Sequence, residues 1–233
     1  MVRLSIVFLF ILFLVPGKSP AQRTKPDKEN RTVFGIQISP ILPNSLIEKN
    51  KVLLDFDTTV YEFVQRPGIL FGMEVRHDFT KWLALQTGIN LLKRNYRLTV
   101  THFDSVMTDD LGLICYETPV AALIYIRLSK YIYMNTSYGL NLTYFPSDLA
   151  IRGKLLAMRY SWIRPALLIN LGWELRTEKA GFFYLGCSYS RMFTDVYRIA
   201  AKKPTESIGD YTLFEERGSY FSVNIKYFFP SGR

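Results

Sequence analysis

The sequence predicts an all-β protein, an eight-stranded antiparallel up-and-down transmembrane β-barrel over residues 32–229. Three observations lead to this prediction. About eight segments alternate between apolar and polar side chains, which is the period of a strand with one apolar face. The connections between these segments are alternately long and short. Aromatic residues gather near the segment ends, as they do at the two interfaces of a bilayer.

The ends of the chain are expected to lie outside the barrel. Residues 1–21 read as a cleaved secretory signal peptide, with a basic Arg3, an apolar run over 4–15 and small residues up to Ala21. The run is too short for a transmembrane helix, which needs roughly 20 residues. Residues 22–31 are expected to form a periplasmic N-terminal linker, and 230–233 a C-terminal extension.

The predicted strands follow one another as a meander. They span residues 33–42, 68–79, 82–98, 113–127, 132–144, 159–175, 181–194 and 220–229. The segment 132–144 is the clearest, because its even positions are apolar, aromatic or Thr. Short turns at 80–81, 128–130 and 177–180 share one end of the barrel with both termini. Outer-membrane barrels have short periplasmic turns, so both termini are predicted to be periplasmic.

A soluble barrel or sandwich would show the same alternation. The polar faces favour a membrane instead, because they carry Gly, Ser, Asn, Thr and Gln rather than many charges. The aromatic residues form two predicted girdles. Phe79, Trp82, Tyr131, Trp173, Phe183 and Phe229 lie near the short turns, and Tyr144, Tyr160, Trp162 and Phe193 near the long connections.

The net charge of +9 sits mainly in loops and tails. Basic and aromatic residues do not alternate as they would in a nucleic-acid binding surface, so no nucleic-acid partner is expected. The expected partners are outer-membrane lipid and lipopolysaccharide, which is anionic. Two cysteines could form a disulfide in an oxidising compartment. Odd and even positions of a strand face opposite sides, a rule here called strand parity. It puts Cys115 on the polar face and Cys187 on the apolar face, which predicts two unpaired thiols.

Two segments resemble a known family. Residues 72–90 resemble the second hairpin of the porin-like outer-membrane β-barrel proteins of Bacteroidota, which include the PorT-type barrels. Tyr116-Glu117-Thr118-Pro119, followed by an aliphatic run to Tyr125, is similar to that family's fourth strand. The resemblance implies an outer-membrane barrel and leaves the function open. The residues after Phe229 depart from barrels that end at a terminal aromatic.

The lumen of an eight-stranded barrel is just wide enough to be filled by side chains. Parity predicts a polar network that faces inward, made of Glu74, Arg76, Glu117, Arg164, Glu174 and Lys226. Counting residues from the strand ends predicts that Glu174 pairs with Lys226 and Glu117 with Arg164. A structural plug is the main interpretation, and a proton or ion path the alternative.

The two longest connections, 43–67 and 195–217, are the candidate binding surface, because loops of this length are usually functional or disordered. They adjoin the predicted seam between first and last strand, and could form one patch. Its candidate residues are Lys49, Lys51, Asp55, Asp57, Lys202, Lys203 and Tyr211. The predicted function is that of a structural or interaction protein acting through these loops. A secretion or envelope assembly component and a narrow channel are the alternatives.

No catalytic, cofactor or metal site is predicted. His102, Asp104 and Ser105 supply residue types used by hydrolases, but they are sequence neighbours in a loop. A nucleophile needs a rigid wall to aim it at its substrate, so an enzyme is not expected.

Overall fold

The computed structural model describes most of the chain between Arg31 and Pro230. The described residues are 31–43, 51–56, 59–146, 149–151, 155–159, 161–177, 180–194, 197–202, 211–216 and 218–230. The predicted signal peptide and all but the last residue of the linker lie outside them. Within this part of the chain, no helix has the length and apolarity needed to cross a membrane.

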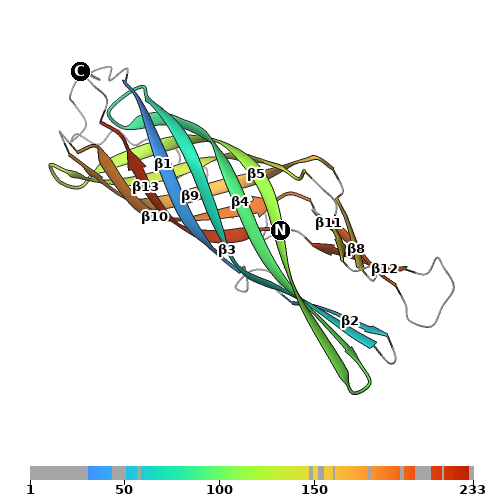
Figure 1. Ribbon diagram of the computed structural model, residues 1–233. Helices are drawn as coiled ribbons and strands as arrows, with labels where there is room; N and C mark the ends of the chain where they lie inside the picture. The colour runs from blue at the N-terminus through green and yellow to red at the C-terminus, as the bar shows by residue number, and fades with distance from the viewer. Residues whose placement is uncertain are drawn as a thin grey trace, which may run out of the picture.

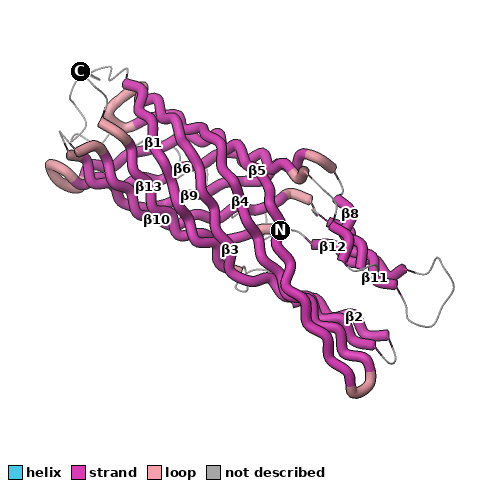
Figure 2. The backbone as a smooth tube through the Cα atoms, viewed as in Figure 1, coloured by secondary structure: helices cyan, strands magenta, loops and turns pink. Residues whose placement is uncertain are grey.

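Eight long strands close into a ring in which each strand pairs with both neighbours in antiparallel fashion (Figures 1 and 2). They are β1 (Arg31–Leu42), β3 (Thr59–Asp78), β4 (Leu83–His102), β5 (Ser105–Arg127), β6 (Ile132–Tyr144), β9 (Ile163–Arg176), β10 (Phe182–Met192) and β13 (Tyr220–Phe228). Consecutive members of this series are neighbours, and β13 returns to β1. The predicted eight-stranded barrel is confirmed.

The wall is polar inside and apolar outside. In β6, Asn135, Ser137 and Asn141 are buried in the lumen, whereas Tyr138 and Leu140 face outward and are almost half exposed. The other strands alternate in the same way. A soluble barrel would bury its apolar side, so this arrangement requires an apolar solvent around the wall.

Exposed aromatic side chains mark both ends of the wall. Phe79, Trp82, Tyr131, Trp173, Phe183 and Phe229 are exposed around the short turns, and Tyr144, Trp162 and Phe193 around the opposite end. The side chain of Tyr160 is not described. The two groups match the predicted girdles, and they bound the apolar band between them.

Three strands are longer than predicted. β3 begins at Thr59 rather than 68, and β4 and β5 meet at a turn formed by Phe103 and Asp104. The strand pairing shifts between Arg66 and Ile69, which is a β-bulge. Buried residues are at odd positions before the bulge and at even positions after it, so the period-2 pattern is broken there. A Cβ at Gly68 would collide with the carbonyl oxygen of Lys93, so the bulge requires glycine.

Beyond the bulge, the strands of this sheet continue past the barrel as a segment here called the extension. It consists of β2 (Lys51–Phe56), residues 59–66 of β3 and the hairpin 95–112 of β4 and β5. A second sheet is formed by β7 (Leu149–Ile151), β8 (Leu155–Arg159), β11 (Tyr197–Lys202) and β12 (Tyr211–Glu216). Figure 1 shows both at the end opposite the short turns. The connections predicted as loops therefore contain strands.

Both cysteines are free thiols, as predicted. Cys115 is buried in the lumen and Cys187 is exposed on the outer face. Because they lie on opposite sides of the wall, they cannot meet within one chain.

Candidate functional site

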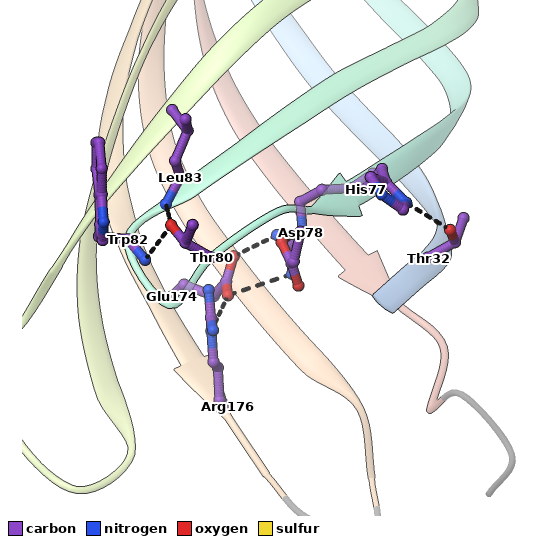
Figure 3. A network of polar contacts seen from close by, with 9 residues as sticks. Thr32, His77, Asp78, Thr80, Trp82, Leu83, Glu174 and Arg176 are labelled. Carbon is purple, nitrogen blue, oxygen red and sulfur yellow. Dashed lines mark hydrogen bonds and ion pairs between the residues drawn. The ribbon is translucent and has the colours of Figure 1, made fainter. Parts of the chain in front are cut away.

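The short-turn end of the lumen holds a network of buried charges. Glu174 accepts hydrogen bonds from Nη1 of Arg76 at 2.7 Å and from Nε of Arg176 at 2.6 Å. The side chains of Arg76 and Glu174 are both fully buried. Asp78 lies 3.5 Å from Nε of Arg76. Figure 3 shows Asp78, Glu174 and Arg176 close together at this end of the barrel.

The Arg76–Glu174 pair crosses the bore. Arg76 is on β3 and Glu174 on β9, and these strands are four places apart in either direction around the ring. Their side chains therefore meet in the middle of the lumen. Burying two charges in this way is tolerable because they are paired and share further hydrogen bonds.

Aromatic rings enclose the same cations. The guanidinium of Arg76 lies 4.2 Å from the ring centre of Phe228, and that of Arg176 lies 4.3 Å from the rings of both Tyr125 and Tyr133. Such cation–π contacts stabilise a charge that has left water. Together with the carboxylates, these rings fill the short-turn end of the lumen.

A second bore-crossing contact lies nearer the other end. Glu117 on β5 accepts hydrogen bonds from the hydroxyl of Tyr220 at 2.7 Å, from Asn141 at 2.7 Å and from Thr143 at 3.1 Å. Tyr220 is on β13, again four places from β5 around the ring. Arg94 lies over the ring of Tyr220 at 5.1 Å and donates to the carbonyl of Gly218.

Above this level most of the large buried side chains are apolar. Ile41, Leu70, Leu92, Leu113, Cys115, Phe145, Ala166 and Met192 form one buried cluster that belongs to six strands and the residue after β6. Apolar side chains at this depth exclude water from the bore. Two polar layers and a mainly apolar one therefore follow one another along the lumen.

The structure places the residues of the predicted lumen network inside the wall but pairs them differently. Lys226 donates to Glu74 at 2.8 Å, and Glu174 bonds the two arginines. Arg164 is half-buried and donates to Thr194 at 2.8 Å. The predicted pairs Glu174–Lys226 and Glu117–Arg164 were therefore wrong.

Strand register explains the error. Glu174 and Lys226 do lie in one row, but Tyr184 of the intervening strand lies between them. Thr143 lies in the same way between Glu117 and Arg164. Residues separated by a strand are about 10 Å apart, so the intervening side chain or a group across the bore becomes the partner.

Sequence reasoning also missed Arg94, Asp78 and Arg176. All three are at inward positions of their strands, and Arg94 is in phase with the buried Asn90. Parity could have found them. Within the described chain, no three His, Cys, Asp or Glu side chains are grouped as a metal site.

The predicted loop surface is divided between the two sheets. Lys51 and Asp55 are on β2, whereas Lys202 and Tyr211 are paired residues of β11 and β12. Lys49, Asp57 and Lys203 lie outside the described residues. β2 pairs with β3, and β11 pairs with β8 and β12, so the two halves do not share a sheet.

Among solved structures, the chain is similar to the outer membrane protein OprG from Pseudomonas aeruginosa. The TM-score is 0.57 with 12% sequence identity, over 87% of this chain and 97% of OprG. The chain has the fold of an outer-membrane β-barrel. At this identity the likeness concerns the fold alone. No protein-family model matches the sequence, and no curated protein matches it either.

Proposed function

We propose that this chain is an outer-membrane protein with a closed lumen, which acts as an interaction protein through the extension and the second sheet. The observation that carries this proposal is the pair of contacts across the bore, Arg76 with Glu174 and Glu117 with Tyr220. They favour an interaction protein over the alternative of a narrow channel, because a conducting path would have to break both.

The proposed orientation puts the extension outside the cell and both termini in the periplasm. It is supported by the short turns, which lie at the end where β1 begins and β13 ends. Outer-membrane barrels have short periplasmic turns and long extracellular loops. The proposed partners are outer-membrane lipid, lipopolysaccharide and envelope or secretion-system proteins. A component of a secretion or envelope assembly, like the PorT-type barrels that the sequence resembles, is the second candidate function.

The location has its own test. The mature protein should fractionate with the outer membrane and migrate faster on gels when unheated than when boiled, because a closed ring has no free edge for detergent to open. A soluble periplasmic species whose migration is independent of heating would contradict the proposed location.

The functional surface is tested by shortening the hairpin of β4 and β5. Asn95 and Gly112 are paired across it, so a two-residue Asn-Gly turn can join them directly. This variant should keep outer-membrane insertion and heat-modifiable migration, and should lose cross-linked partner proteins or the deletion phenotype. A matched variant replaces residues 195–217 of the second sheet with a short turn.

The combined variant decides the assignment. If full activity survives the loss of both regions, the function belongs to the lumen, the lipid face or the periplasmic turns, and the proposal is wrong. The fold would be unaffected by that result.

A further inference from the structure

The outer surface of the wall changes character at the base of the extension. Three rows of paired, outward-facing residues cross β3, β4 and β5 there. In order from the barrel outward, they are Phe71, Leu91 and Tyr116, then Ile69, Lys93 and Ile114, then Arg66, Asn95 and Gly112. The apolar residues of the first two rows are 40–54% exposed. The apolar band therefore ends within one row, and two cations stand at its edge.

These two cations are available to a ligand. Arg66 and Lys93 are both exposed. Arg66 lies near enough to Asp110 to help lower the pKa of that carboxyl, but within the described residues neither cation is held by a hydrogen bond or ion pair. One row further out, Arg97 donates to both carboxylate oxygens of Asp110, at 2.7 and 3.0 Å. That hydrogen bonding holds the pKa of Asp110 below its usual range. The carboxylate of Asp110 is thus hydrogen-bonded to Arg97, and its interaction with Arg66 is the weaker of the two.

Gly112 puts no side chain beside the cations. A Cβ at this position would lie 3.6 Å from Cε of Lys93 and 3.8 Å from Oδ1 of Asn95. The amide of Asn95 is fixed, because its Nδ2 donates to the carbonyl of Pro67 at 2.8 Å. Its Oδ1, a hydrogen-bond acceptor, lies beside Gly112.

The cations, the Asn95 oxygen and the apolar residues next to them together fit an amphiphilic ligand. Two exposed cations fit a phosphate, and the Asn95 oxygen fits a hydroxyl or amide N–H donor, as a sugar headgroup supplies. Directly below, Ile69, Leu91 and Ile114 offer an apolar surface to acyl chains. Lys93 lies between Ile69 and Ile114, so its stem can follow the apolar band while its ammonium reaches the headgroup level.

We propose that the base of the extension is a binding site for a phosphorylated glycolipid of the outer leaflet. Its phosphate contacts Arg66 and Lys93, and its sugar sits over Gly112 and donates to Asn95. The inference rests on the proposed outer-membrane location with the extension outside. It adds a defined lipid site to that location, on the outer face of three of the eight wall strands.

The test measures lipid bound to the purified full-length protein in detergent, by native mass spectrometry during a titration with diphosphorylated, hexa-acylated lipid A. The variant Arg66→Gln/Lys93→Gln should bind about 10- to 30-fold more weakly, since each cation near a charged lipid surface contributes about 1 kcal/mol. Arg191→Gln is the matched control. It removes an exposed charge from β10, on another part of the wall, and should leave binding unchanged.

Two further variants of the experiment test the contact at Gly112 and the phosphate separately from the general charge. Gly112→Val keeps both cations but places a side chain where the sugar is proposed to sit, so it should weaken lipid A binding several-fold. With dephosphorylated lipid A, the wild type should bind as weakly as the double variant, and the double substitution should have no further effect. Inorganic phosphate at equal concentration should not displace lipid A, because it lacks the acyl chains.

Equal binding by the wild type and the double variant would overturn the proposal, as would an equal loss with Arg191→Gln. Displacement by inorganic phosphate would make it a site for free phosphate and overturn the lipid assignment. Heat-modifiable migration and membrane fractionation of the same preparations are read separately. Failure of lipid binding in an inserted barrel therefore rejects this site alone, whereas failure of insertion rejects the proposed location.

Discussion

Glu174→Ala is expected to lower the free energy of unfolding by about 3–5 kcal/mol, the usual range for removing one partner of a buried ion pair. Glu174 is fully buried and accepts hydrogen bonds from both Arg76 and Arg176. Without it, two guanidinium groups remain in the lumen with one carboxylate, Asp78, near Arg76. The measurement is a urea titration of the folded barrel in detergent, followed by heat-modifiable migration.

Asp110→Ala is the matched control, since it also removes a carboxylate bonded to an arginine. The Arg97–Asp110 pair is exposed, so this change should leave the stability nearly unchanged. The double replacement Arg76→Met/Glu174→Met should cost less than the sum of the two single replacements. Strict additivity, or a loss no larger than that of Asp110→Ala, would contradict a stabilising role for the buried pair.

The barrel could be predicted from the sequence because the lipid around it imposes an alternation of apolar and polar side chains. Lipid outside and polar groups inside give a period of two in every wall strand, and β6 was predicted at its observed limits, Ile132–Tyr144. The girdles followed from the same logic, as Trp82 and Trp173 illustrate. The free cysteines followed from parity alone.

The extension could not be predicted, because the bulge at Pro67 and Gly68 reverses the parity of β3. Tyr61 and Phe63 are buried at odd positions, whereas Leu70 is buried at an even one. A pattern that changes phase beside a proline looks like a loop end. The polar composition of the segment strengthened that wrong interpretation.

The lumen network was predicted in part of its residues but not in its contacts. Parity says which side of the wall a residue faces, and it identified Arg76 and Glu174. It cannot say which residues meet across the bore, because that depends on the barrel's diameter and on rotamers. The contact of Glu117 with Tyr220 is of the same kind, and no count along neighbouring strands would reveal it.

The central claim is that the lumen is closed, so the most direct measurement is conductance. The purified full-length protein is inserted into planar bilayers, and single-channel current is recorded at low voltage. We expect no steady conductance of general-porin size, because an eight-stranded ring has little free bore and side chains join across it at two levels. Large, long-lived openings at low voltage would contradict the closed lumen and favour a transport function.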